Sequence, residues 1–167
     1  MTARATLPAI LQTLLLRDLA AVRRSVEAYP DDASVWAQPT GLPNAAGTLV
    51  LHLAGNLRHY IGTVLGGDAY TRDRPAEFSR RDVPRAELLA ELDAASAAIT
   101  RTMPILTDAT LSQSYPEPIG GHALQTDVFL THIAVHLAYH LGQIDYHRRV
   151  VTGDATPIGA MAVSALA

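Results

Sequence analysis

The chain has 167 residues, of which 49% are hydrophobic, 17% charged and 5% aromatic, and its formal net charge is −3. This length and hydrophobic share predict one globular domain over residues 1–167 and exclude a disordered chain. The small negative charge argues against nucleic acid as a partner, and the absence of cysteine excludes disulfides, thiolate metal ligands and a cysteine nucleophile.

The first half of the chain predicts two helices. Leucine and valine recurring at spacings of three and four indicate an amphipathic helix over about residues 7–29. A connector rich in proline and glycine follows over residues 38–44. Asn44 is the expected N-cap of a second helix, which runs to about residue 65 and ends at the glycine pair 66–67.

The second half predicts two more helices separated by loops. The charged segment 70–81 lacks periodicity and is expected to be a salt-bridged loop. A third helix opens near Pro84, and a fourth covers residues 126–151 and closes at Gly153, with the arginine pair 148–149 as a solvated end. The apolar face of the third helix consists of Leu88, Leu92, Ala95, Ile99 and Met103.

Four helical segments without any alternating strand pattern predict an all-α fold, a four-helix bundle with two long connections. The second helix is apolar over a wider arc than one bundle core uses, so a homodimer is expected to cover the excess.

No targeting segment or membrane span is expected. Pro8 interrupts the early apolar patches, and no small-residue cleavage site follows them. The longest apolar runs, 48–54 and 129–138, contain histidine and fall short of the roughly 20 residues of a membrane span. We therefore expect a cytoplasmic protein.

Seven histidines stand out, and their placement suggests metal binding. His136 and His140 lie four residues apart, so both rings can reach one cation from the same helix face. A buried imidazole needs a partner, and a hydrogen-bonded core histidine is the ordinary alternative. These two histidines belong to a core-facing stripe of the fourth helix made of Phe129, Ile133, His136, His140, Ile144, His147 and Val151.

A third ligand has to come from another helix, and the second helix offers His52 and His59. Their Cα atoms are about 10 Å apart at the helical rise, so only one of them is expected to join the pair. His132 with His136 remains the competing pair. One sector of the second helix contains no Lys, Glu or Asp and predicts a polar pocket; it comprises His52, Gly55, Asn56, His59, Gly62 and Thr63.

The fourth-helix run 132–143, with the pattern His-x-x-x-His-x-Gly-Gln at its end, and the second-helix run 51–56 around His52 closely resemble the DinB-like family of damage-inducible bacterial proteins. The resemblance covers nearly the whole chain. It implies a four-helix bundle that carries a divalent metal ion, with His52, His136 and His140 as the ligands.

Three neutral imidazoles leave a divalent ion with its full charge and an open position, as in catalytic zinc sites. The resemblance and this chemistry suggest a metal-dependent hydrolase or a small-thiol-dependent S-transferase that acts on a small electrophilic substrate, with a low-molecular-weight thiol as co-substrate in the second case. Zinc, nickel, iron and manganese are all admissible at such a site. The alternative is a non-catalytic metal- or ligand-binding protein of a stress response.

The remaining site residues are candidates without an assigned role. His59 and His132 are candidates for a general base. Tyr139 and Gln143 are candidates for the pocket wall, and Gln143 also for an acceptor that orients a ligand histidine. The inner helix faces lack a carboxylate, which argues against a glutamate base of the protease type.

Overall fold

The computed structural model describes residues 5–166, and over this range the protein is all-helical, with no strand and only two isolated backbone bridges. The long helices are α1 (Leu7–Glu27), α3 (Ala46–Leu57), α5 (Arg85–Thr102) and α7 (Thr126–Thr152). The short helices are α2 (Asp32–Val35), α4 (Arg74–Ser79) and α6 (Asp108–Leu111). A π-helical turn, Arg58–Thr63, extends α3, and 3₁₀ turns cover Met103–Ile105 and Val163–Leu166.

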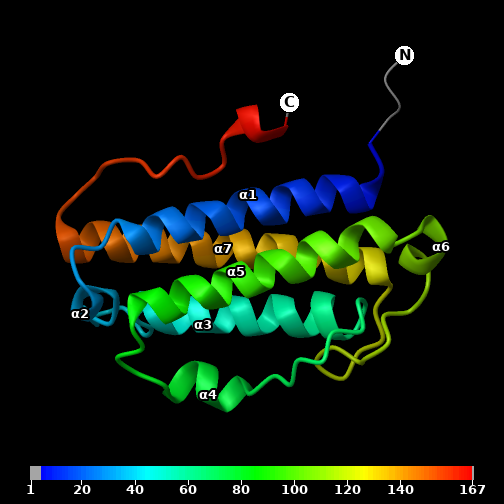
Figure 1. Ribbon diagram of the computed structural model, residues 1–167, viewed down its shortest axis with the longest axis horizontal. Helices are drawn as coiled ribbons and strands as arrows, with labels where there is room; N and C mark the ends of the chain where they lie inside the picture. The colour runs from blue at the N-terminus through cyan, green and yellow to red at the C-terminus, as the bar shows by residue number, and fades with distance from the viewer. Residues whose placement is uncertain (1–4, 167) are drawn as a thin grey trace.

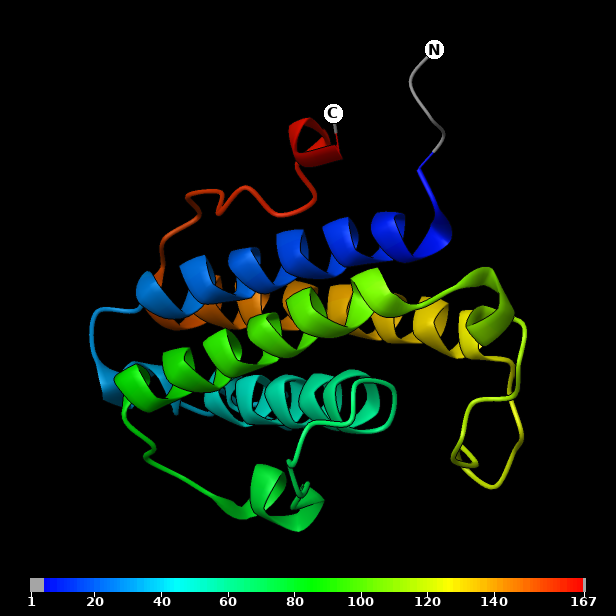
Figure 2. The same cartoon turned by 45° about the vertical axis from the view of Figure 1, so that its right-hand side comes forward.

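The four long helices lie side by side around one apolar core (Figures 1 and 2). α1 packs along α7 and α5, and α3 packs against α5, α7 and the short α4. The core is built from leucine, isoleucine and valine at helical spacing, because such a stripe faces the neighbouring helices on every turn. None of the described helices is long and apolar enough to cross a membrane.

The predicted helices are confirmed at their periodic parts. The predicted face of the third helix, from Leu88 to Met103, is buried throughout. The fourth helix ends as predicted at Gly153, which adopts the left-handed conformation with φ 70°.

Two local predictions in the first half of the chain were wrong. Ala45, not Asn44, precedes the first turn of α3, and no side chain caps this end. The segment predicted as a loop contains α4, because the Asp73 carboxylate accepts a hydrogen bond from the backbone of Ala76 at 3.0 Å and Pro75 stands in the first turn. The predicted salt bridges of this segment are present, among them the one between Arg72 and Glu77.

The wide apolar arc of the second helix is covered within the chain. Every residue of α3 except Asn56 is buried, with α4 packed against it on the side away from the core. The arc therefore gives no support for a dimer through this helix.

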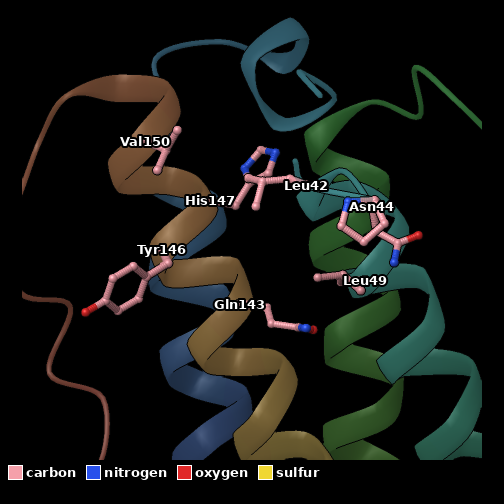
Figure 3. A pocket seen from close by; sticks show the side chains of 8 residues that line it. Leu42, Asn44, Leu49, Gln143, Tyr146, His147 and Val150 are labelled. Atoms are coloured by element: carbon pink, nitrogen blue, oxygen red, sulfur yellow. The ribbon is translucent and has the colours of Figure 1, made fainter. Parts of the chain in front are cut away.

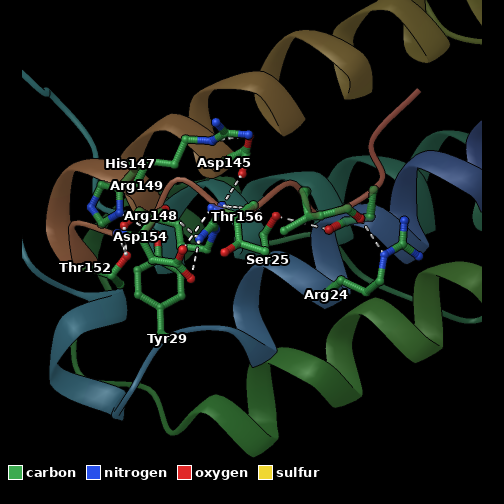
Figure 4. Close-up of polar contacts among 12 residues, drawn as sticks. Arg24, Ser25, Tyr29, Asp145, His147, Arg148, Arg149, Thr152, Asp154 and Thr156 are labelled. Carbon is green, nitrogen blue, oxygen red and sulfur yellow. Dashed lines mark hydrogen bonds and ion pairs between the residues drawn. The ribbon is translucent and has the colours of Figure 1, made fainter. Parts of the chain in front are cut away.

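The last turn of α7 is not a solvated end as predicted. Arg148 is 1% exposed, and its guanidinium donates to Asp145 Oδ1 at 2.9 Å and to the carbonyl oxygens of Asp154 and Thr156 at 3.0 and 2.8 Å (Figure 4). Arg24 of α1 holds the next stretch by donating to the Ile158 carbonyl oxygen at 2.7 Å. These bonds fasten the C-terminal segment back along α1, which buries the arginine.

Candidate metal centre

Three histidine rings from two helices converge between α3 and α7. His136 Nε2 lies 3.3 Å from His52 Nε2 and 3.0 Å from His140 Nε2. The three rings offer ligand nitrogens that all lie within 4.8 Å of one another, so this group could hold a metal ion. Two imidazole nitrogens bound at about 2.0–2.1 Å to one tetrahedral zinc ion would lie roughly 3.3–3.4 Å apart, which is close to the spacing seen here.

Hydrogen bonds on the far side of two rings leave the converging nitrogens free to coordinate. His52 Nδ1 donates to Glu77 Oε2 at 3.0 Å, and His140 Nδ1 donates to Gln143 Oε1 at 2.6 Å. Because both acceptors are oxygens, each Nδ1 carries the hydrogen and each Nε2 presents a lone pair. Lone pairs aimed at one point with no donor between them fit a cation, and outer acceptors of this kind orient histidine ligands in metal sites.

Glu77 is the residue beside the histidine cluster that the sequence interpretation missed. Its carboxylate is buried, and it also accepts two hydrogen bonds from Arg72, at 2.7 and 2.9 Å. Burial raises the pKa of Glu77, but the hydrogen bonds from His52 and Arg72 outweigh burial and hold the pKa below its ordinary value. A carboxylate therefore stands behind His52, supplied by α4 and not by the long helices.

Gly55 makes room for this carboxylate. A Cβ at Gly55 would overlap Glu77 Oε1, so glycine on this turn of α3 leaves the space that the carboxylate occupies. The motif Asp-Arg-Pro-Ala-Glu at residues 73–77 was the available signal, because an aspartate followed by proline in the first turn marks a helix start.

The two clustered histidines of α7 are held in the neutral form. Burial lowers the pKa of His136 to about 4, helped by the neighbouring rings of His140 and His52. Burial also lowers the pKa of His140, against the opposing effect of its hydrogen bond to Gln143. Neutral imidazoles are the form that coordinates metal, so the site is ready for a cation at neutral pH.

A cavity of about 220 Å³ opens beside His52 and His136. Asn56 forms part of the cavity wall, and its Oδ1 atom is buried with no hydrogen-bond partner among the described residues. The cavity joins polar and apolar surface and is lined by His52, Asn56, Tyr60, Arg72, Arg74, Ile119, Phe129, His132, Ile133 and His136.

The other candidate residues fall into different places. His59 does not join the cluster, because it lies seven residues beyond His52, on the π-helical turn. Its Nε2 instead forms a hydrogen bond with Glu117 Oε2 at 3.1 Å. His132 lines the cavity, with its ring stacked 6.2 Å from that of His136. Tyr139 is 64% exposed. Gln143 both accepts from His140 and lines a second cavity.

That second cavity lies toward the C-terminal end of α7 and is apolar (Figure 3). It has a volume of about 180 Å³ and is lined by Leu42, Pro43, Asn44, Leu49, Gln143, Tyr146, His147 and Val150. His147 contributes only a wall here, because both of its ring nitrogens are already hydrogen-bonded, to Tyr29 at 2.6 Å and to the Ala37 carbonyl at 2.8 Å.

The chain matches one family model, described as "Protein of unknown function (DUF1572)", over residues 10–158. This range includes the three clustered histidines and Glu77. No curated protein and no solved structure matches the chain at a significant level.

Proposed function

The chain belongs to the family of proteins of unknown function DUF1572, and we propose that it is a divalent-metal-binding enzyme with His52, His136 and His140 as ligands. We further propose that its four long helices form a DinB-like four-helix bundle. Its substrate would be a small electrophile, attacked by water or by a low-molecular-weight thiol.

One observation carries the metal proposal: three imidazoles face one point, and the outer hydrogen bonds of two of them are made by Nδ1, which leaves Nε2 directed at that point. A hydrogen-bonded histidine cluster would place donors and acceptors in alternation. Here two nitrogens of fixed tautomer both approach His136 Nε2, which can carry at most one hydrogen.

When bound to three imidazoles, a divalent ion keeps its full positive charge and an open position, and so lowers the pKa of a coordinated water or thiol. Zinc and nickel suit this ligand set best, and iron and manganese are admissible. Glu77 and Gln143 orient two of the ligand rings. The Glu77 carboxylate is not free to remove a proton from substrate, since it is bonded to His52 and Arg72, and the amide of Gln143 is not a base.

The cavity beside the cluster supports a substrate site. It gives a small molecule access to the face of His136, and its wall includes Phe129 and Tyr60 for apolar contact and the guanidinium groups of Arg72 and Arg74 for a polar group. The imidazole of His132 lies in this wall beside His136, so we propose it, in place of His59, as the general base.

The first test is metal content. Elemental analysis of the full chain after purification without chelator should find about one divalent ion per chain, and little in the His136→Ala variant. The exposed His122 provides the matched control, since His122→Ala should keep the ion. Equal metal content in both variants, or none in the unaltered chain, would contradict the proposal.

The second test is turnover. Chromogenic ester hydrolysis measures the water reaction, and conjugation of monochlorobimane with bacterial thiols measures the thiol reaction. Metal-dependent activity that is lost in His136→Ala and reduced in His132→Ala supports an enzyme. A protein that binds metal but is inactive in both assays would instead favour the non-catalytic metal-binding function.

A further inference from the structure

The outer face of α7 carries an exposed apolar stripe. Five large side chains on it are 52% to 70% exposed: Val128, Val135, Tyr139, Tyr146 and Val150. They follow one another at intervals of seven and four residues, which places them along a single face of the helix. At the helical rise this stripe is about 33 Å long.

Charged residues are missing from the first three-quarters of this face and flank it only at its ends, where Arg149 lies over the ring of Tyr146. Residues 128–144 contain no Asp, Glu, Lys or Arg, although Thr131, His132, Gly142 and Gln143 are exposed along with the apolar residues. The solvent face of a helix ordinarily carries charges, and depletion of charge together with tyrosine enrichment is typical of the centre of a protein interface.

Gly142 lies on the same face, and no neighbour among residues 5–166 crowds it. A Cβ built there meets nothing within 4 Å, so no neighbour requires a glycine. Glycine inside a helix costs about 1 kcal/mol relative to alanine. A helical glycine allows the backbone of another helix to approach closely, and no backbone among the described residues does so at Gly142.

We propose that this stripe is the interface of a homodimer, in which α7 of one chain packs antiparallel against α7 of a second copy with the two-fold axis near Tyr139. In this arrangement Val128 faces the partner's Val150. Asp127 at one end of the stripe then lies near the partner's Arg149 at the other. A parallel pair would instead place the like charges together.

The apolar cavity of Figure 3 supports the same arrangement. Tyr146 and Val150 of the stripe form part of its wall, together with Leu42 and Leu49. The antiparallel register places residues 128–135 of the partner over this cavity, so their side chains can fill it. Because Gln143 lines the cavity and also bonds His140, the interface adjoins the metal centre without depending on it.

Analytical ultracentrifugation of the full chain tests the interface. The unaltered protein should sediment at twice the monomer mass of 17.8 kDa, and Tyr139→Glu and Gly142→Leu should shift it to the monomer. Ile105→Glu is the matched control, because Ile105 is also exposed, at 65%, but lies outside the stripe, and should leave the dimer intact. A monomer at every concentration, or equal effects of Tyr139→Glu and Ile105→Glu, would overturn the proposal.

Cysteine cross-linking tests the orientation and needs no destabilising change, since the chain has no cysteine of its own. Under mild oxidation Tyr139→Cys should link to itself, because facing Cα atoms of two packed helices lie within disulfide range. Val128→Cys should link to Val150→Cys in a mixture but not to itself, and Ile105→Cys should not link. Self-linking of Val128→Cys would contradict the antiparallel arrangement. Elemental analysis of the same fractions reports metal binding separately from assembly.

Discussion

Histidines on one stripe of α7 meet two different chemical environments. His136 and His140 direct their Nε2 atoms at each other, 3.0 Å apart, with His52 beside them. His147 instead accepts a hydrogen bond from Tyr29 on Nδ1 and donates to the Ala37 carbonyl from Nε2. His147 is more buried than His136 and His140, so burial alone does not mark the rings that could bind a cation. The hydrogen-bond partners of the second ring nitrogen distinguish the two environments.

The His147 environment is structural. Burial raises the pKa of Tyr29 far above its ordinary value, so its hydroxyl stays protonated and donates. Burial likewise lowers the pKa of His147, against the hydrogen bond to Ala37, and keeps the ring neutral. The ring thus connects α7 to Tyr29, two residues after α1 (Figure 4), and to Ala37, two residues after α2. A completed donor and acceptor pair leaves no lone pair for a cation.

The largest contrast is expected between His136→Ala and His147→Ala. Loss of a ligand should weaken metal binding by more than the roughly 10- to 100-fold seen for outer partners of metal ligands. His147→Ala should keep the ion but unfold more easily by about 2–3 kcal/mol, because Tyr29 and Ala37 lose their partner. Isothermal titration with zinc and urea denaturation measure the two effects. Loss of the ion in His147→Ala would remove the distinction.

Arg148→Met should give the next largest effect, on stability alone. It leaves Asp145 with one partner, Arg149 at 2.9 Å, and leaves the carbonyl oxygens of Asp154 and Thr156 without their donor. Breaking such a buried network costs about 3 kcal/mol. Urea denaturation should show this loss, and limited proteolysis should cut the released C-terminal segment.

Arg149→Met is the matched comparison for this arginine pair. Arg149 is only partly buried and bonds Asp145 alone, so the loss should stay below about 1 kcal/mol. Equal losses in the two variants would mean that burial of Arg148 does not matter.

Periodicity was enough to predict the helices that contain the site. Apolar residues at spacings of three and four place His136 and His140 toward the core of α7, because a stripe of this kind faces neighbouring helices on every turn. Spacing alone left His52 and His59 as alternatives. In the structure His52 lies in the cluster and His59 does not, because residues 58–63 form a π-helical turn that redirects His59. The periodic pattern of the sequence does not predict where a π-helical turn occurs.

The outer contacts of the cluster could not be predicted from periodicity. Glu77 lies on a helix of six residues, which is too short to show an apolar stripe, and it reaches His52 across a gap that exists only because Gly55 has no side chain. Arg148 was misjudged for a related reason. Its burial depends on residues 153–159 folding back along α1, a tertiary contact that the sequence does not signal.

Glu77→Gln should weaken metal binding by roughly 10- to 100-fold, that is about 1.4–2.7 kcal/mol. The amide keeps the size of the side chain but removes the charge that accepts from His52 and Arg72. Gly55→Ala should act in the same direction, since the added methyl group displaces the carboxylate. Zinc titration measures both variants.

Glu87→Gln provides the control for the loss of one carboxylate. Glu87 is exposed and pairs with Arg80, away from the cluster, so the affinity for zinc should not change. An unaltered affinity in Glu77→Gln would show that the carboxylate behind His52 does not contribute to binding.

The last expected effect is the pH dependence of the metal-free protein. His136 has a pKa of about 4 in the folded chain and about 6.5 when unfolded. Between these values the unfolded chain binds a proton that the folded chain does not, so the free energy of unfolding falls as the pH falls from about 6.5 toward 4. His140 and His147, whose pKa values are also lowered, act in the same direction. Each histidine contributes at most about 1.4 kcal/mol per pH unit, and less where the ring is partly exposed.

The slope of the free energy of unfolding against pH also distinguishes the clustered histidines from His147. Urea denaturation at several pH values should give a shallower slope in His136→Asn than in the unaltered chain, while His122→Asn, which changes an exposed ring, should leave it unchanged. Added zinc should steepen the slope of the unaltered chain because protons compete with the ion for the ligand nitrogens. Added zinc should steepen the slope of the His147→Asn variant by the same amount, since the His147 ring does not face the proposed ion. A slope that zinc leaves unchanged would mean that the ion does not bind the titrating rings.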